Sequence, residues 1–168
     1  MKKLNFSDIQ KQIIIGSILG GCSLSKQPKG KNYYLSMRSK DLLWLRYKME
    51  ELYNCFETTE VSRQNVTYIC NTQSSESFTE IYNVLYKDGK RHITTKLLDN
   101  LKDIGLAIWF IEGGGWGGRG RKNAYINTTL LSEGSSELIE DYFNSMSGIR
   151  CSINCARDRK KILFSVKG

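Results

Sequence analysis

The sequence contains a single histidine, His92, and its five cysteines lack the paired spacing of a metal site. Cys151 and Cys155 stand four residues apart in a segment that we expect to form a strand, where they would meet different neighbours. The scarcity of histidine and the odd number of cysteines argue against a zinc site. They favour reduced thiols, which are usual in a cytosolic or organellar compartment.

The sequence also lacks a long apolar run, since no segment approaches the roughly 18 apolar residues of a membrane-spanning helix. The start "MKK" and the segment "LGGC" at residues 19–22 are typical of a bacterial lipoprotein signal. Polar residues between Asp8 and Gln12 interrupt that signal, however, and leave only residues 13–19 as its apolar region. We therefore expect no membrane partner and no secretion.

Acidic residues are outnumbered, with 17 aspartates and glutamates against 25 lysines and arginines, which gives a net charge of +8. A basic surface favours an acidic partner such as nucleic acid or anionic lipid. Aromatic, amide and hydroxyl side chains are interleaved with the basic ones, a combination typical of nucleic-acid binding. With 168 residues and 40% hydrophobic content, the chain is long enough to fold around a substantial core.

The first half of the chain has clear signals for helices and strands. Ser7 followed by Gln10 forms a capping box, which predicts a helix over residues 8–20. Residues 25–32 form a polar turn that contains the only proline. The following patterns predict a strand over 33–39, a helix over 40–54, a hairpin turning near 64–65 and a helix over 75–86.

The same order begins again about ninety residues later, which indicates a degenerate internal duplication. The second half is predicted to contain a helix ending at 113, a turn and strand over 116–129, a helix over 135–146 and a hairpin turning near Asp158. We therefore divide the chain into lobes at 1–95 and 96–168. The second lobe ends where a helix equivalent to 75–86 would begin.

Two segments carry a family resemblance. "IIGSILGGC" at 14–22 and "LAIWFIEGG" at 106–114 resemble the paired nonapeptides of the single-chain, two-motif LAGLIDADG homing endonucleases encoded in introns. The flanking segments "NVLYKDGKRHITTKLLDNL" and "YINTTLLSEGSSELIEDYF" resemble this family too. The resemblance implies an α+β fold of two pseudo-symmetric αββαββα lobes with saddle-shaped antiparallel sheets, here with the second lobe lacking its last helix.

The resemblance also implies that the two motif helices pack side by side. We expect Gly16, Gly20 and Ala107 to allow close approach, and Ile108 to make the contact asymmetric. The apolar residues of the helices are expected to be ordinary core residues: Ile14, Ile18, Leu19, Phe110 and Ile111.

The eighth nonapeptide position in this family holds a catalytic acid, and the two carboxylates bind the Mg²⁺ that drives strand hydrolysis. In this sequence these metal-ligand positions are Gly21 and Gly113. Glu112, the only neighbouring acid, is a weak replacement because it points about 100° away around the helix. We expect impaired Mg²⁺ binding and lost cleavage. The alternative explanation is that the two glycines serve as helix caps, for which glycine is well suited.

The segment "GKR" before the second motif holds Lys90 and Arg91. The resemblance places a basic catalytic residue here, near the scissile phosphates. Arg91 aligns better, but a one-residue gap leaves the choice between the two open.

Polar side chains on the predicted strands and turns are candidates for reading base edges in the major groove. Because they occur in both halves, we expect a monomer on a long, asymmetric duplex DNA site. The candidates are Lys29, Lys31, Arg38, Arg63, Gln64, Arg119, Arg121, Asn123, Asn127, Arg157 and Arg159. Those expected at phosphates are Lys26, Lys122, Lys160 and Lys161.

Three functions are compatible with these features. The first is a homing endonuclease that binds double-stranded DNA specifically but has lost cleavage. The second is an intron RNA maturase, with intron RNA as its partner, and the third is a non-cleaving DNA-binding regulator. We favour the first. The expected location is an organelle, mitochondrion or chloroplast, or the bacterial cytoplasm.

Overall fold

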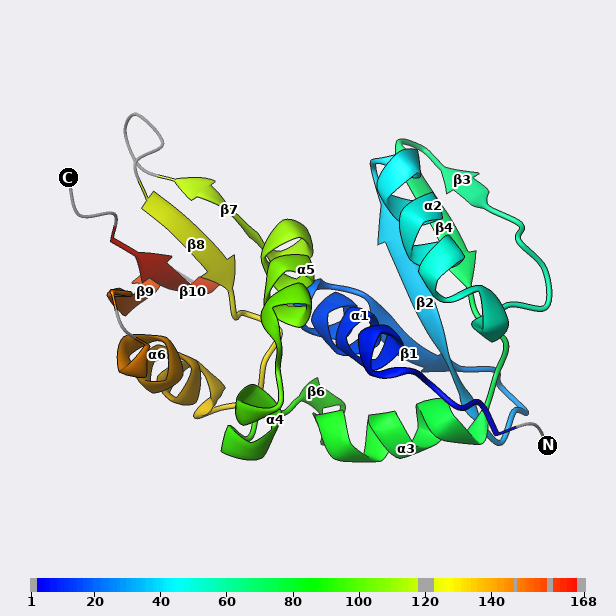
Figure 1. Ribbon diagram of the computed structural model, residues 1–168, viewed down its shortest axis with the longest axis horizontal. Coiled ribbons are helices and arrows are strands. Elements are labelled where there is room, and N and C mark those ends of the chain that lie inside the picture. Colours follow the sequence, from blue (N-terminus) through cyan, green and yellow to red (C-terminus); the bar gives the residue numbers. More distant parts are fainter. Residues whose placement is uncertain (1–2, 118–122, 147, 157–158, 166–168) are drawn as a thin grey trace.

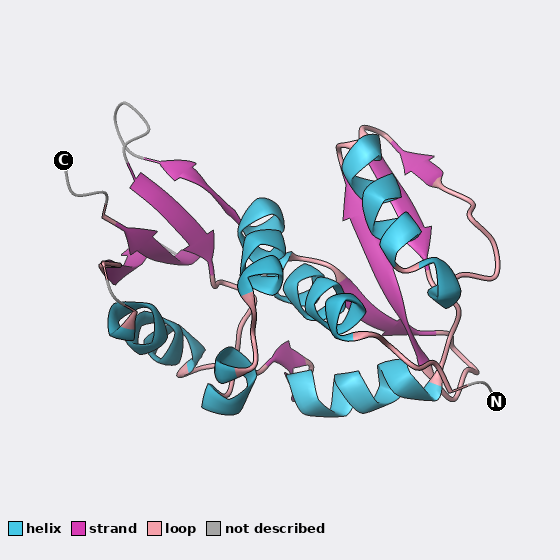
Figure 2. Ribbon diagram, in the orientation of Figure 1, coloured by secondary structure: helices cyan, strands magenta, loops and turns pink. Residues whose placement is uncertain are grey.

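The computed structural model describes residues 3–117, 123–146, 148–156 and 159–165. Two four-stranded antiparallel sheets lie on either side of a central pair of helices (Figure 1). Further helices pack on one face of each sheet, as the colouring by element type shows (Figure 2). Within the described part of the chain, no helix has both the length and the apolar content that a bilayer crossing requires.

The first lobe begins with the central helix α1 and ends with helix α3. Its strands pair in the order β1-β2-β4-β3. A short hairpin, β5 and β6, then leads to the second lobe. The elements are α1 (Asp8–Gly20), β1 (Ser23–Lys26), β2 (Tyr33–Ser39), α2 (Leu42–Glu51), the 3-10 turn η1 (Tyr53–Cys55), β3 (Ser62–Gln64), β4 (Thr67–Asn71), α3 (Glu76–Leu85), β5 (Tyr86–Lys87) and β6 (Lys90–Arg91).

The second lobe repeats this topology, with strand order β7-β8-β10-β9. Its elements are α4 (Thr95–Asp99), α5 (Asp103–Gly113), β7 (Gly114–Gly117), β8 (Asn123–Asn127), α6 (Ser135–Ser145), β9 (Cys151–Ala156) and β10 (Arg159–Phe164). The repeat confirms the α+β fold with two pseudo-symmetric lobes. Among the described residues, none after β10 forms a counterpart of α3. The lobe boundary between residues 95 and 96 stays a prediction.

Most predicted elements are confirmed, with differences at their ends. The helix predicted over 40–54 begins later because Asp41 caps it, accepting hydrogen bonds from the amides of Leu43 and Trp44. Part of the turn predicted over 25–32 is strand β1, and α4 was not predicted. The first hairpin turns at Asn65, whose φ of 55° suits asparagine. The turn predicted near Asp158 lies outside the described residues.

Helices α1 and α5 pack closely through glycine. A Cβ atom at Gly16 would lie 2.5 Å from the carbonyl oxygen of Gly105, and one at Gly20 would lie 2.5 Å from Cβ of Glu112. The prediction for Gly16 and Gly20 is therefore confirmed. Ala107 was predicted wrongly, because it is exposed. Gly105, Ile108 and Glu112 are among the α5 residues that face α1, at spacings of three and four, and Ala107 lies off this stripe.

The two lobes exchange core residues across this helix pair. Leu19 of α1 packs in the buried cluster of the second lobe, with Trp109, whereas Ile108 of α5 packs in the cluster of the first lobe, with Ile14. Ile108 fits because it lies over Gly16. The lobes therefore share a continuous apolar contact, whose burial favours one fixed arrangement of the two sheets.

The predicted core residues are mostly buried. Ile14 and Ile18 are fully buried, Leu19 is buried, and Phe110 is half-buried. Ile111 was predicted wrongly, since 56% of its surface is exposed. It lies about 100° around the helix from Phe110, away from the packed side of α5.

Candidate nucleic-acid interface and helix-base site

Gly21 and Gly113, at the ends of the two central helices, are favoured as glycines for different structural reasons. Gly21 follows α1 with φ 147° and ψ −15°, a conformation that residues with a side chain rarely adopt, and its amide donates to the Ser17 carbonyl. Gly113 is the last residue of α5, and a Cβ there would lie 3.0 Å from Cα of Gly20. Backbone conformation thus favours glycine at 21, and close packing favours it at 113.

Glu112 is committed to a buried ion pair. Its carboxylate contacts the ammonium of Lys48 on α2, and the two side chains are 9% and 0% exposed. Trp44 Nε1 donates to Glu112 Oε1 at 3.1 Å, and the Cys22 thiol donates to Oε2 at 3.2 Å. Both carboxylate oxygens are therefore occupied by protein donors.

The buried pair also determines the state of Cys22. Burial raises the pKa of the Cys22 thiol to about 11, an effect that Lys48 opposes and Glu112 reinforces. The Lys48 ammonium lies 3.7 Å from the sulfur. At neutral pH, Cys22 is therefore a protonated thiol that donates to Glu112, and it does not act as a thiolate ligand.

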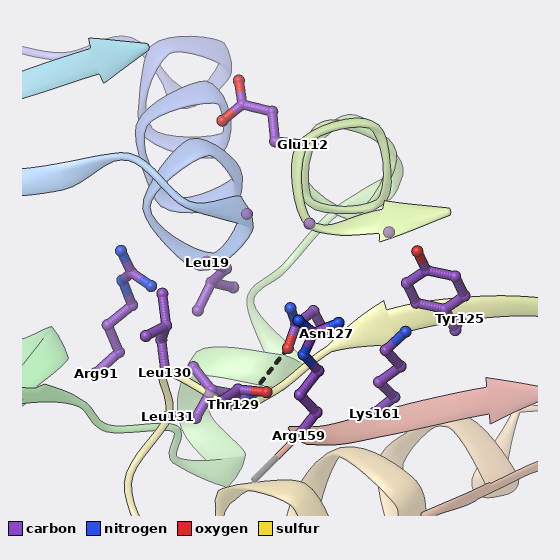
Figure 3. A pocket seen from close by; sticks show the side chains of 13 residues that line it. Leu19, Arg91, Glu112, Tyr125, Asn127, Thr129, Leu130, Leu131, Arg159 and Lys161 are labelled. Carbon is purple, nitrogen blue, oxygen red and sulfur yellow. Dashed lines mark hydrogen bonds between the residues drawn. The ribbon is translucent and has the colours of Figure 1, made fainter. Parts of the chain in front are cut away.

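A cavity of about 510 Å³ lies at the base of the helix pair. Arg91 of β6, together with Arg159 and Lys161 of β10, contributes positive charge to its lining. Figure 3 shows the Glu112 carboxylate turned away from these three cations. The lining residues are Leu19, Gly20, Arg91, Glu112, Gly113, Gly114, Tyr125, Asn127, Thr129, Leu130, Leu131, Arg159 and Lys161.

Arg91 closes the end of α1. Its Nη2 donates to the carbonyl oxygens of Gly21 at 3.3 Å and Cys22 at 2.9 Å. Arg91 is only 8% exposed, and its buried Nε has no hydrogen-bond partner among the described residues. A cation at the C-terminal end of a helix is electrostatically favourable. Two carbonyl oxygens at the end of α1 are thus bonded to an arginine.

The residues at the helix bases do not fit a divalent cation. The described part of the chain holds no group of three His, Cys, Asp or Glu residues that could bind a metal. A site for Mg²⁺ needs carboxylate oxygens, whereas this cavity presents three cations and one carboxylate already paired with Lys48. The arrangement instead suits an anion such as a phosphate group.

Strand register defines an open face on the first sheet. Met37 packs in the core beneath the helices, so Arg38, the next residue of β2, lies on the opposite face. Arg38 of β2 and Ser62 of β3 both pair with Ile69 of β4, so they lie on the same face of the sheet. Gln64 is two residues after Ser62 and therefore points to the same side. Arg38 and Gln64 therefore share the open face.

Lys26 and Arg63 lie on the helix side of the first sheet. Lys26 pairs with Tyr33, two residues from the buried Leu35, and its ammonium lies 5.6 Å from the Tyr33 ring centroid. Arg63 pairs with Tyr68, and its guanidinium lies 5.5 Å from that ring. Lys29 and Lys31 are exposed in the turn between β1 and β2.

The second sheet has an equivalent open face. Ile126 and Ile162 are paired and buried, which places their neighbours Asn127 and Lys161 on the opposite side as a second pair. Lys161 lies 3.9 Å from the ring centroid of Tyr125, on the same face. Alternation also places Asn123 and Arg159 there, whereas Lys160 lies on the helix side.

Sequence reasoning placed some site residues together and missed others. Of Lys90 and Arg91, Arg91 lines the cavity and Lys90 is exposed. Lys48 and Trp44 were not singled out, because a lysine among charged neighbours in a helix normally points to solvent. The signal that could have indicated Lys48 was Glu112 itself, because a carboxylate in an apolar helix needs a cationic partner when it is buried. Arg119, Arg121, Lys122 and Arg157 lie outside the described residues.

Solved structures share this fold. A structure titled the homing endonuclease I-WcaI bound to its DNA recognition sequence matches with a TM-score of 0.83 at 19% identity, covering 98% of this chain and 78% of that one. The crystal structure of I-DmoI in complex with DNA and Mn matches with a TM-score of 0.64 at 13% identity, covering 94% and 90%. At these identities the likeness shows the fold.

The curated relatives carry several different names. Protein RecA of Mycolicibacterium flavescens is 28% identical over 159 residues, 85% of this chain and 37% of that protein. Probable intron-encoded endonuclease 1 of Wickerhamomyces canadensis is 24% identical, covering 89% and 69%. Cytochrome b mRNA maturase bI2 of Debaryomyces hansenii is 27% identical, covering 71% and 50%. The chain spans about two-fifths of the RecA relatives.

The family itself follows from a match over nearly the whole sequence. Residues 11–167 match the model of the LAGLIDADG DNA endonuclease family, and the match includes both motif helices and both sheets. The chain belongs to the LAGLIDADG DNA endonuclease family.

Proposed function

We propose that this chain binds double-stranded DNA at a specific, asymmetric site and does not cleave it. The observation that carries the proposal is the charge of the helix-base cavity. Arg91, Arg159 and Lys161 line it, and the carboxylate of Glu112 is bound to Lys48. The cavity can therefore attract a backbone phosphate, but it offers no carboxylate pair for a metal.

The loss of hydrolysis follows from the chemistry of these groups. A divalent metal both neutralises the phosphate and lowers the pKa of the attacking water. Arginine and lysine can neutralise the phosphate, but an arginine remains protonated and cannot accept a proton from water. A phosphate in this cavity would thus be held without an activated nucleophile.

Specific reading of DNA is assigned to the two open sheet faces. An antiparallel sheet can present alternate side chains to base edges in the major groove. Arg38 and Gln64 in the first lobe, and Asn123, Asn127 and Arg159 in the second, are the candidates that share these faces. Their residue types differ between the lobes, which favours an asymmetric site bound by one monomer. The structure titled the homing endonuclease I-WcaI bound to its DNA recognition sequence has the same fold, which supports DNA binding by these sheets.

Phosphate contacts are assigned to exposed lysines around the faces. The sequence suggested Lys29 and Lys31 as base-reading residues, but they lie in the β1–β2 turn outside the sheet, so we assign them to phosphates. Lys26, which ends β1 beside this turn, keeps its assignment to a phosphate. Lys160 lies on the helix side of the second sheet, so we assign it no base contact. Such contacts give affinity without sequence information and make binding depend on salt.

The proposal is tested by selecting binders from a randomised duplex library in Ca²⁺ and, separately, in EDTA. The expected result is one long, non-palindromic consensus in both, because binding does not need the metal. Failure to enrich any duplex would contradict the proposal. A palindromic consensus would contradict the monomeric, asymmetric mode.

A second candidate function is an intron RNA maturase. The observation that favours it is the similarity to the cytochrome b mRNA maturase bI2 of Debaryomyces hansenii. RNA binding would use shape and unpaired bases rather than the major groove. Competition between the selected duplex and a structured intron transcript separates the two candidates. The yeast relatives also favour an intron-borne, organellar gene, which sequencing of its genomic surroundings would test.

A further inference from the structure

We propose that Tyr125 is a positioning residue for phosphate binding, because its ring lies across the glycines of β7 and holds the Lys161 ammonium at the helix-base cavity. The inference rests on the phosphate site of the proposed function and adds a residue that acts through another. Tyr125 of β8 and Lys161 of β10 both line that cavity, and both are half-buried. The two strands are neighbours in the second sheet.

Glycines of β7 give the Tyr125 ring its place. Tyr125 pairs with Gly115, and Gly117 lies two residues further along the same face. A Cβ atom at Gly115 would lie 2.8 Å from the Tyr125 hydroxyl oxygen, and one at Gly117 would lie 3.3 Å from Cδ1 of the ring. Gly115 does not have a positive φ, so its backbone conformation does not itself require glycine. The missing side chain at position 115 therefore makes room for the ring.

The ring in turn places the Lys161 ammonium. Lys161 is a diagonal neighbour of Tyr125 across the two strands, because Tyr125 pairs with Leu163, two residues further along β10. The Nζ atom of Lys161 lies over the ring, 3.9 Å from its centroid, within the range of a cation–π attraction. Figure 3 shows the ammonium turned toward the Tyr125 ring at the cavity wall. The contact thus holds a flexible side chain in one orientation.

An ammonium that is already held binds a phosphate at a lower entropic cost. A lysine that extends freely into water loses rotamer freedom when it binds a ligand. Contact with the Tyr125 ring restricts these rotamers before the phosphate arrives. The ammonium has three N–H donors, so the ring contact leaves donors for a phosphate oxygen. Tyr125 therefore acts on the phosphate through Lys161.

The other copy of the internal repeat shows that the fold itself does not require this arrangement. Gly21 corresponds to Gly113, so β1 maps onto β7 with a constant offset. The pairs Ser23–Ser36 and Gly115–Tyr125 then align β2 with β8, and the pairs Arg38–Ile69 and Asn127–Lys161 align β4 with β10. The first lobe has neither the glycines, nor the ring, nor the cation. Its residues at the four positions are Ser23, Ser25, Ser36 and Ile69.

The first arm of the test follows Lys161 by NMR of the full chain with ¹³C-labelled lysine, and inorganic phosphate is the probe. Lys161→Arg identifies the signal. The Hε protons of Lys161 are expected to lie upfield of those of other lysines, because the ring current of Tyr125 shields them, and to shift as phosphate is added. Tyr125→Leu should remove the upfield shift and weaken phosphate binding about three- to fivefold, as expected for a partly exposed cation–π contact.

Three further variants separate the ring contact from a general effect on the fold. Tyr125→Phe keeps the ring and should keep the upfield shift. Gly115→Ala pushes the hydroxyl end of the ring away from β7 and should reduce the shift without changing either partner. Tyr68→Leu is the matched control, because it removes the ring next to Arg63 on the helix side of the other sheet and should leave Lys161 unaffected. Circular dichroism should show all variants folded.

The second arm is a double-mutant cycle on the selected duplex. Tyr125→Leu should weaken binding about three- to fivefold in the unchanged chain and should have no further effect in Lys161→Met. The proposal is overturned if Tyr125→Leu weakens binding equally in both backgrounds, or if the Lys161 signal shows no upfield shift. Because the first arm needs no DNA, a chain that selects no duplex would refute the proposed function, and the phosphate titration would still decide the role of Tyr125.

Discussion

Lys48 and Glu112 form a buried ion pair that joins the two lobes, Lys48 from α2 of the first and Glu112 from α5 of the second. Together with the exchange of Leu19 and Ile108 between the cores, this pair fixes one sheet relative to the other. The same contact removes the one acid of the helix-base cavity from the reach of a metal. One ion pair therefore both helps to place the sheets and keeps Glu112 from replacing the two missing acids.

Removing the acid of this pair should destabilise the fold. Glu112→Gln leaves the Lys48 ammonium buried without its counter-charge, which costs about 3–5 kcal/mol in comparable cases. The measurement is urea unfolding followed by circular dichroism. Glu80→Gln, which removes the exposed Lys3–Glu80 pair, serves as the control and should barely move the midpoint. Equal midpoints for both variants would show that the buried pair does not hold the lobes.

Alkaline pH should destabilise the fold through Cys22. The folded thiol has a pKa of about 11 against an ordinary value of 9.0, so between these pH values the unfolded chain loses the proton first. This part of the stability is complete below pH 9 and falls by about 1.4 kcal/mol per pH unit above it. Unfolding free energies from pH 8 to 11 should show a shallower decline for Cys22→Ala. Identical slopes would refute the assignment.

Two glycine substitutions should separate packing from backbone strain. Gly16→Ala places Cβ 2.5 Å from the Gly105 carbonyl and must push α5 away, with an expected cost of about 1–3 kcal/mol. Gly21→Ala meets no atom within 4 Å, and its cost, about 1 kcal/mol, comes from the φ of 147°. Thermal unfolding measures both. If Gly16→Ala were as stable as the unchanged chain, the assignment of a close contact between α1 and α5 at Gly16 would be contradicted.

Base reading should depend on the face of the sheet. Arg38→Ala on the open face is expected to lose about 1–3 kcal/mol of discrimination between the selected site and a mismatched one. Lys160→Ala on the helix side should leave that ratio unchanged. Competition gel shifts at fixed salt provide the ratio. If Lys160→Ala lost discrimination and Arg38→Ala kept it, the assignment of the DNA-reading faces would be wrong.

Local patterns predicted the helices and most strands of this fold because their signals lie within a few residues. The capping box of Ser7 and Gln10 is confirmed by reciprocal hydrogen bonds of 3.2 and 3.1 Å. Contacts between segments far apart in the sequence were harder to predict. Ala107 was expected at the helix contact and is exposed, because the crossing of α1 and α5 selects which stripe faces inward.

The candidate site shows the same limit. The positions Gly21 and Gly113 could be recognised from the nonapeptides, and both lie at helix ends. The partner of Glu112 could not, because Lys48 lies 64 residues away and resembles a surface lysine in sequence. Its burial depends on the packing of α2 against β2 and β4 and on the contact with Glu112 of α5, which no local pattern encodes.

Restoring the acids should restore affinity for a divalent cation. The double variant Gly21→Asp, Gly113→Asp places two carboxylates at the helix bases. Its cost in stability is expected to come from the φ of Gly21 and from the Cβ contact of residue 113 with Gly20. Calorimetric titration with Ca²⁺ in the presence of the selected duplex should show binding to the double variant and none to the unchanged chain. Equal Ca²⁺ binding by both would place the metal elsewhere.

The most direct test of the central proposal is a time course of the unchanged chain on its selected duplex in Mg²⁺, with binding and strand integrity followed in the same samples. The proposed function predicts a saturable, salt-dependent complex in which both strands stay intact. Double-strand cleavage that requires Mg²⁺ would contradict it, because the helix-base cavity would then support catalysis without the two acids.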